Sequence, residues 1–301
     1  MTSSYITVVP ASTRAGKEAI RALLEDGNKP FVRGIYRNTT KVPAEYASDP
    51  NFEAVEGDVG VGESLDFGNS DAVFFVPPPT FEGMDTGEWA TLIASNVREA
   101  IKKAPSVKKL VLHSAVGAHH EHGIGILRLN RIADRILRAA APEVVIVQPG
   151  WYIEMFARAF QTMQADPPIF ETEFSPADHK TGMVSVQDIG RYCANALLEE
   201  ASANPGPREV KLLGPRLYSS LDVQHAVEEI TGQKAETKVV DKQDLPQWFE
   251  AHVPKGYAQE LAELVISSLP GGILEEDVVY TDQTVRGTVE MVDALRRVAT
   301  Q

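Results

Sequence analysis

Hydrophobic positions in the first half of the chain alternate between short continuous runs and longer stretches with helical spacing. Tyr5–Val9 is a short β-branched run, and residues 14–25 then place their apolar side chains on one face of a helix. Almost wholly apolar runs such as residues 72–76 are typical of strands that helices cover on both faces. The alternation therefore predicts a doubly wound parallel sheet of the α/β class. Strands are expected at 5–9, 31–36, 52–55, 71–76, 108–113 and 144–148, and helices at 14–25, 87–103 and 123–140.

The pattern changes after Gln148, where Pro149 and Gly150 interrupt the chain. We expect residues 1–150 to form a nucleotide-binding domain of the doubly wound type. Residues 151–301 are expected to form mostly a smaller, mixed α/β lobe, with some segments returning to the sheet. In this part, helices are expected at 151–164, 186–200, 219–231, 243–252, 257–268 and 284–298, strands at 184–186, 209–213 and 236–240, and an irregular segment at 166–181.

Composition narrows the classes of partner. The 42 acidic and 29 basic residues give a formal net charge of −13, which disfavours nucleic acid and anionic membrane surfaces. Because Cys193 is the single cysteine, the chain cannot form an intrachain disulfide. We expect Cys193 to lie on a helix with its side chain buried in the protein core. The start of the chain lacks a basic segment followed by an apolar one. We therefore expect a cytoplasmic protein, monomeric or homodimeric, that acts on a small molecule.

The first strand-to-helix turn is where a doubly wound sheet usually carries glycines that approach a pyrophosphate. Here the turn runs from Pro10 to Gly16, and only the last glycine of the usual pattern is present. Two interpretations stay open. Either Ser12, Thr13, Arg14 and Gly16 form a reshaped dinucleotide loop, or the pyrophosphate site has closed.

The end of the second strand favours the first interpretation. An NAD-binding site has an acidic residue there, which binds the ribose 2′-hydroxyl. This chain has Arg37 instead, and an arginine suits a 2′-phosphate. If a dinucleotide binds, we expect NADP(H).

Seven segments, in this order and spacing, together carry a resemblance to a known family. They are residues 5–16, 32–38, 56–58, 71–78, 110–117, 148–156 and 188–190. In these segments the chain resembles the NmrA-like group of atypical short-chain dehydrogenase/reductase proteins. The resemblance implies a Rossmann-like domain with a small C-terminal lobe, and activities in the group range from NADP(H)-dependent reductases to sensors that bind the cofactor without turnover. It also implies that Arg37 meets the 2′-phosphate.

The resemblance assigns further cofactor contacts and also exposes a departure. Gly57 and Asp58 would flank the adenine, and Phe75, Val76 and Pro77 would line the ribose and nicotinamide end. Reductases of the wider superfamily use a Tyr-x-x-x-Lys pair for proton donation. The corresponding stretch, residues 126–130, contains neither a tyrosine nor a lysine.

Candidate acid–base residues follow the fifth strand. His119, His120 and His122 lie in a loop that leaves the carboxyl edge of the sheet, where ligands bind in open α/β folds. A metal site is not expected, because adjacent residues do not all converge on one ion and no second ligand cluster lies nearby in sequence. Ser114 and Tyr152 complete the catalytic candidates, as a hydrogen-bond donor and a hydroxyl that orients substrate or donates a proton.

Three functions are consistent with these features. The first is NADP(H)-dependent reduction of a small apolar or aromatic metabolite such as a quinone or ketone. The second is cofactor-independent acid–base catalysis by an isomerase, cyclase or dehydratase, in a Rossmann-like fold that no longer uses its cofactor. The third is a non-catalytic regulatory protein that senses NADP(H).

Overall fold

The computed structural model describes residues 4–80, 82–200, 202 and 205–300. The chain divides into two compact units that are interleaved along the sequence. Unit 1 comprises residues 1–115, 128–148 and 189–210, and unit 2 comprises residues 116–127, 149–188 and 211–301.

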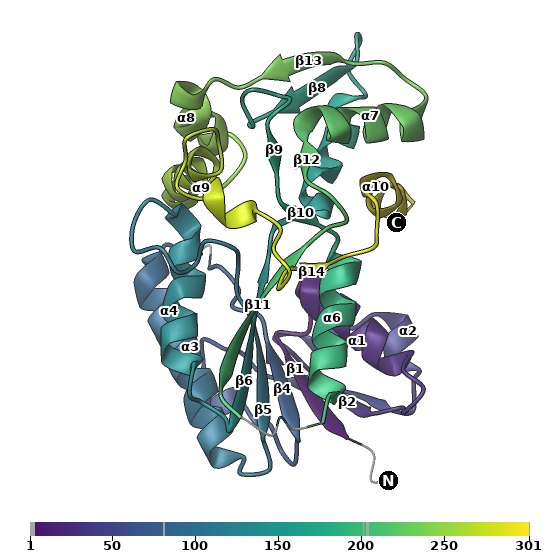
Figure 1. The fold of residues 1–301 in the computed structure, drawn as a ribbon. Helices are drawn as coiled ribbons and strands as arrows, with labels where there is room; N and C mark the ends of the chain where they lie inside the picture. The colour runs from purple at the N-terminus through teal and green to yellow at the C-terminus, as the bar shows by residue number, and fades with distance from the viewer. Residues whose placement is uncertain (1–3, 81, 201, 203–204, 301) are drawn as a thin grey trace. The chain divides into compact units, whose positions relative to one another are not determined.

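Unit 1 is built on parallel strands in the order β3-β2-β1-β4-β5-β6, with β11 next to β6 (Figure 1). This order belongs to the doubly wound class that the sequence predicts, and its direction reverses between β1 and β4. Each of these strands lies within three residues of its predicted bounds. The strands are β1 (Tyr5–Val9), β2 (Phe31–Tyr36), β3 (Phe52–Glu56), β4 (Ala72–Phe75), β5 (Lys109–His113), β6 (Glu143–Pro149) and β11 (Pro207–Leu213).

Helices cover both faces of this sheet, α3 and α4 on one side and α1 and α6 on the other (Figure 1). Buried aliphatic side chains between the sheet and the α3–α4 pair form a continuous core. On the other face α6 packs directly on α1, because a Cβ at Gly190 would lie 2.4 Å from the Cβ of Glu18. The helices are α1 (Arg14–Leu24), α2 (Ala44–Ala47), α3 (Thr86–Lys103), α4 (Arg128–Leu137) and α6 (Val186–Leu198), with 3₁₀ turns η1 (Thr39–Lys41) and η2 (Gly62–Ser64).

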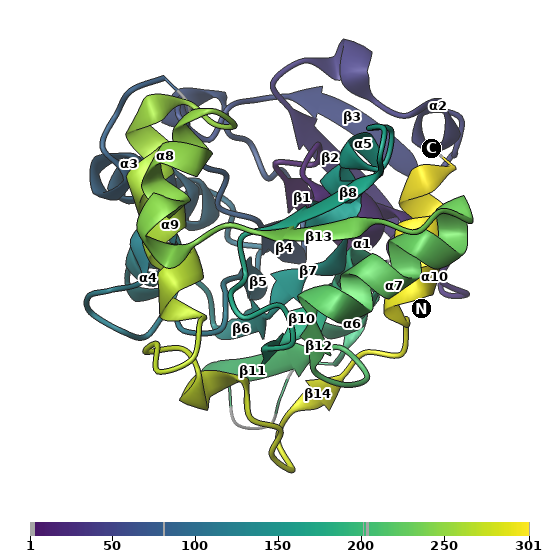
Figure 2. The ribbon, with the colours of Figure 1, turned by 90° about the horizontal axis from the view of Figure 1, so that it is seen from above.

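Unit 2 has its own aromatic and aliphatic core, and its strands form two-residue and four-residue pairs: β7 with β10, β9 with β12, and β8 with β13. Figure 2 shows β13 running between α7 and the α8–α9 pair. The strands are β7 (Trp151–Tyr152), β8 (Ile169–Thr172), β9 (Lys180–Thr181), β10 (Met183–Val184), β12 (Tyr218–Ser219), β13 (Glu236–Val239) and β14 (Val285–Arg286). The helices are α5 (Ala159–Thr162), α7 (Ser220–Thr231), α8 (Leu245–Glu250), α9 (Lys255–Ser267) and α10 (Met291–Ala299), with 3₁₀ turns η3 (Gly125–Leu127), η4 (Ile153–Arg158), η5 (Lys242–Asp244) and η6 (Glu276–Val278).

A buried carboxylate fixes the C-terminal segment of unit 2. Asp188 accepts hydrogen bonds from the backbone amides of Thr288 and Val289 at 3.0 and 2.9 Å. Gly287 allows this approach, because a Cβ there would lie 2.4 Å from the Asp188 carboxylate. The chain before α10 is therefore held to the start of α6.

Three predicted helices are wrong at their N-terminal ends. The helix expected at 123–140 begins only at Arg128, after the 3₁₀ turn η3, and ends at Leu137. The other two begin with a strand. The helix expected at 151–164 begins with a strand, because Trp151 and Tyr152 pair with Met183 and Val184, and helical structure starts only at Ile153. The helix expected at 284–298 begins at Met291, because residues 285–286 pair with the end of β11. For these last two helices, pairing with a distant segment overrides local helical spacing.

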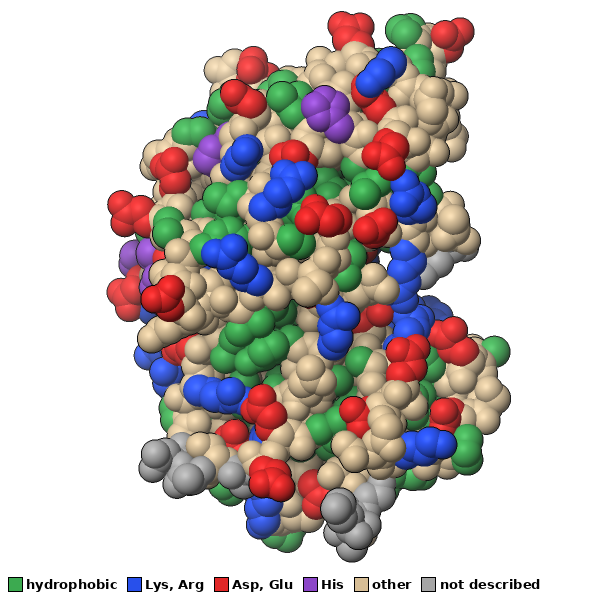
Figure 3. Space-filling view, turned by 45° about the vertical axis from the view of Figure 1, so that its right-hand side comes forward, with side chains coloured by type: hydrophobic (Ala, Val, Ile, Leu, Met, Phe, Trp, Pro, Cys, Tyr) green, Lys and Arg blue, Asp and Glu red, His purple; other side chains and the backbone are tan. Residues whose placement is uncertain are grey.

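Charged side chains of both signs occupy the surface. Acidic and basic side chains are interspersed over much of the face shown in Figure 3. Among the described residues, no helix combines the length and hydropathy that crossing a membrane requires.

Candidate functional site

The turn after β1 lies where the strand order of unit 1 reverses. The amide of Val76 donates to the carbonyl of Val9 at 3.0 Å, so the ends of β1 and β4 are adjacent. Thr13 is the N-cap of α1: its hydroxyl accepts from the amide of Gly16 and donates to the carbonyl of Pro10, both at 3.0 Å. The Thr13 hydroxyl therefore closes hydrogen bonds within the loop itself.

Gly16 is needed for close packing of this loop. A Cβ at this position would lie 2.7 Å from the Thr13 hydroxyl and 2.8 Å from the Pro10 carbonyl oxygen. The surviving glycine therefore holds the start of α1 against the loop.

Three backbone amides at the start of α1 have no acceptor among the described residues, those of the exposed Ser12 and Arg14 and of the buried Ala15. Ser12, Arg14 and Lys17 are exposed, and the first turn of α1 contains no acidic residue. Cations at a helix N-terminus oppose the helix dipole, whereas an anion bound there interacts favourably with both the dipole and the cations. This end of α1 is therefore suited to bind a phosphate group.

Arg37 lies one residue beyond the end of β2 and is exposed. Among the described residues, no ion pair or hydrogen bond is recorded for its side chain. The adjacent Asn38 uses its side-chain oxygen to cap η1 at the amide of Thr40. The cationic group of Arg37 is thus available for a ligand beside the turn after β1.

The residues that the resemblance assigns to the adenine and nicotinamide ends of the cofactor are more buried than Arg37. The Asp58 carboxylate accepts from the amide of Gly60 at 2.8 Å and is partly buried in its own turn. Phe75 is fully buried within the core on the α3–α4 side, and Val76 and Pro77 are also buried. These positions fix the shape of the strand ends, and their contact with a cofactor stays a prediction.

Ser114, at the end of β5, is completely buried and donates to Asp134 of α4 at 2.5 Å. The other carboxylate oxygen of Asp134 is buried without a partner among the described residues. Burial raises the pKa of Asp134 to about 7. The sequence did not single out Asp134, whose only signal is a carboxylate on a helix that is otherwise expected to cover the sheet.

The histidine loop belongs to unit 2, where it contacts the segment after α9. The Nε2 atom of His120 lies 2.7 Å from a carboxylate oxygen of Asp277, and that of His119 lies 3.6 Å from the other oxygen. His122 is exposed and lies outside this cluster. Asp277 was missed in the sequence because 157 positions separate it from His120.

Tyr152 is half-buried on β7, and the structure does not place it in the histidine cluster. Its neighbour Trp151 donates to the hydroxyl of Ser268 at 3.2 Å and stacks edge-on against Phe174. Of the predicted catalytic residues, His119 and His120 are therefore the pair that the structure brings together.

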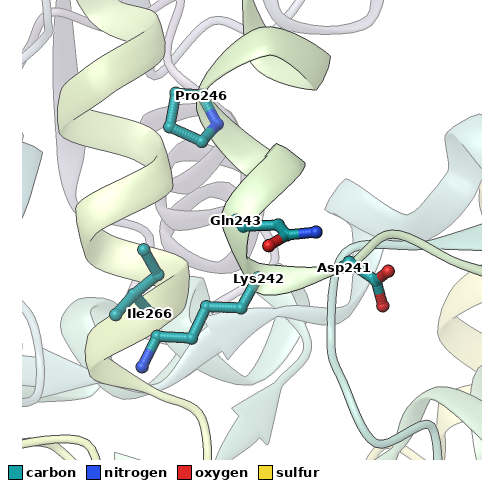
Figure 4. A pocket seen from close by; sticks show the side chains of 5 residues that line it. All are labelled: Asp241, Lys242, Gln243, Pro246 and Ile266. Atoms are coloured by element: carbon teal, nitrogen blue, oxygen red, sulfur yellow. The ribbon is translucent and has the colours of Figure 1, made fainter.

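Unit 2 also carries an open pocket of about 660 Å³, within the range of small-molecule sites. Figure 4 shows Ile266 on α9 beside the segment that leads into α8. The lining residues are Asp241, Lys242, Gln243, Pro246 and Ile266.

Comparison with models of known protein families identifies the family of this chain. The NmrA-like family model matches residues 2–268. The chain belongs to the NmrA-like family. No curated protein matches it significantly.

Solved structures confirm the Rossmann-like fold of this family member. A triphenylmethane reductase from Citrobacter sp., complexed with NADP(H), is 16% identical, with 98% of this chain and 99% of that chain covered and a TM-score of 0.76. An NADPH-dependent quinone oxidoreductase from Escherichia coli, complexed with NADPH, is 14% identical, with 98% and 99% covered and a TM-score of 0.74. Pinoresinol-lariciresinol and phenylcoumaran benzylic ether reductases are similar at 14% identity, 99% coverage of both chains and a TM-score of 0.69.

Proposed function

We propose that this NmrA-like protein is an NADP(H)-dependent reductase of a small apolar or aromatic acceptor, such as a quinone or ketone. The observation that carries the proposal is Arg37, an exposed arginine whose side chain has no ion pair or hydrogen bond among the described residues, at a position where an NAD-binding site has a carboxylate. The triphenylmethane, quinone and pinoresinol-lariciresinol reductases of similar fold support the acceptor class.

The residues of unit 1 fit the phosphates of this cofactor. Arg37 would bind the 2′-phosphate through charge-assisted hydrogen bonds. The amides of Ser12 and Arg14, which have no acceptor among the described residues, would bind the pyrophosphate, aided by the Arg14 side chain. When bound, NADPH would supply a hydride to the acceptor. Thr13 would contribute by holding the loop, because its hydroxyl is already engaged by Gly16 and Pro10.

For the acceptor, we propose the pocket of unit 2. Pro246 and Ile266 offer it apolar contact, while Lys242 and Gln243 offer polar groups that orient an oxygen.

Titration of the full-length protein with NADPH and with NADH, followed by fluorescence or calorimetry, tests the proposal. We expect saturable NADPH binding that is at least tenfold tighter than NADH binding. Absence of NADPH binding at millimolar concentration would refute it and leave cofactor-independent acid–base catalysis. Tight binding without turnover across quinones, ketones and phenolic compounds would instead support an NADP(H) sensor.

A further inference from the structure

Two segments of unit 2 that are remote in sequence bring three metal-ligating side chains together. His119 and His120 come from the loop before η3, and Asp277 comes from η6. The two imidazole nitrogens and the carboxylate oxygen lie within 4.8 Å of one another. The side chains of Asp277 and His120 are 18% and 22% exposed and that of His119 is 56% exposed, so the cluster is open to solvent on one side only.

The spacing of these ligands is fixed by the backbone. His120 closes a turn by donating its amide to the carbonyl of Gly117, and Asp277 closes another by donating to the carbonyl of Leu274, both at 3.1 Å. The first residues of the two turns touch each other, because a Cβ at Gly117 would lie only 2.2 Å from the Leu274 side chain. Gly117 also has a φ of +88°, which favours glycine. Lys211 further fixes the second turn by donating to the Asp277 carbonyl oxygen.

The arrangement of the three side chains accommodates a transition-metal ion. The contact of 2.7 Å between His120 Nε2 and one oxygen of Asp277 has the length of a hydrogen bond, and His119 Nε2 lies 3.6 Å from the other oxygen. The two imidazole rings lie 4.0 Å apart and are inclined by 36°. Tetrahedral zinc with bonds of 2.0–2.2 Å places ligand atoms about 3.3–3.6 Å apart, a spacing that lies within the 4.8 Å span of the two nitrogens and a carboxylate oxygen here.

We propose that His119, His120 and Asp277 bind a divalent first-row transition metal of the Zn²⁺ class, with water in the open fourth position. Two imidazoles and a carboxylate form a donor set that binds such ions in preference to Mg²⁺ or Ca²⁺, which favour oxygen ligands alone. The bound ion cross-links the histidine loop to the segment after α9. The site lies outside the proposed cofactor-binding residues, so its existence does not depend on the proposed function.

Calorimetric titration of the metal-free, tag-free full-length chain with Zn²⁺, and absorption spectroscopy with Co²⁺, test this site. We expect one ion per chain and a tetrahedral Co²⁺ spectrum. His119→Ala and Asp277→Asn are each expected to weaken Zn²⁺ binding at least tenfold and to abolish the Co²⁺ spectrum. His225→Ala is the matched control, because His225 is an exposed histidine on α7.

Thermal unfolding with and without Zn²⁺ separates loss of the site from loss of the fold. Zn²⁺ is expected to raise the Tm of the wild-type protein and of His225→Ala, since an ion that binds only the folded state stabilises it. The Tm of Asp277→Asn is expected to stay unchanged on adding Zn²⁺. The proposal is overturned if the wild-type protein binds no Zn²⁺, or if His225→Ala weakens binding as much as His119→Ala does.

Discussion

The hydroxyl of Ser114 donates a 2.5 Å hydrogen bond to Asp134, and both groups are buried within unit 1. The sequence singles out Ser114 as a hydrogen-bond donor, and here its hydroxyl donates to a carboxylate on α4, a helix that covers the sheet. A carboxyl group with a pKa of about 7 therefore lies on α4, next to the residue that follows β5.

This pKa predicts how stability depends on pH. Native Asp134 binds a proton up to about pH 7, whereas the unfolded chain releases it near pH 4. The native state therefore holds more protons between these values, and its free energy of unfolding falls as pH rises, by at most about 1.4 kcal/mol per pH unit from this group. Asp134→Asn removes this term, so its stability relative to wild type should increase from pH 5 to pH 7.5.

Urea unfolding of both proteins across that range measures the difference. His113, whose pKa burial lowers to about 4, contributes the opposite trend, but it is present in both proteins and cancels. A stability difference that is the same at every pH would show that Asp134 titrates normally.

Arg37→Ala should change cofactor preference. Loss of the charge-assisted contact to a 2′-phosphate is expected to weaken NADPH binding at least tenfold, about 1.4 kcal/mol, and to alter NADH binding less than about twofold. Lys103→Ala is the control, because it removes one exposed positive charge at the C-terminal end of α3. Equal loss of affinity for both cofactors would contradict the assignment of Arg37.

Gly16→Ala should destabilise the protein. The added methyl group would overlap the Pro10 carbonyl oxygen and the Thr13 hydroxyl, and overpacking of this kind costs about 1–3 kcal/mol. Gly27→Ala is the matched substitution, since a Cβ there meets no atom within 4 Å. Chemical denaturation should leave the Gly27 variant within about 0.5 kcal/mol of wild type. A similarly stable Gly16 variant would mean that the loop is loosely packed.

Cys193 should be chemically inert in the native protein. It is fully buried on α6, and burial raises its pKa well above the ordinary range, so the reactive thiolate is suppressed. Ellman's reagent is expected to react with it only as fast as the chain unfolds, and promptly in denaturant. Fast reaction without denaturant would show that α6 opens locally.

The sheet of unit 1 could be predicted because its strands carry a local signal. The run that forms β4 is apolar on both faces, and the strands β1 and β2 occupy the predicted residues. Where β-structure depends on a distant partner, the local signal fails. Trp151 and Tyr152 have helical neighbours in sequence, and only pairing with residues 183–184 makes them a strand.

The same limit applies to the candidate sites. Arg37 could be proposed from the sequence because the role expected of it depends on one position after one strand. Asp134 and Asp277 were not, because each acquires its chemistry from a contact with a residue far away along the chain, Ser114 and His120 respectively. The expectation against a metal site considered only ligands that are close in sequence, and the fold brings Asp277 of the C-terminal region to His119 and His120.

The contact between Asp188 and the amides of residues 288 and 289 bears on where this protein can be shortened. The match to the family model ends at residue 268, yet the amides that donate to the buried Asp188 carboxylate belong to residues 288 and 289. A chain cut at residue 268 would lose both hydrogen bonds, each worth about 1.5–3 kcal/mol because the acceptor is charged. The stretch that the family model matches is therefore shorter than the stretch that this buried carboxylate needs for its hydrogen bonds.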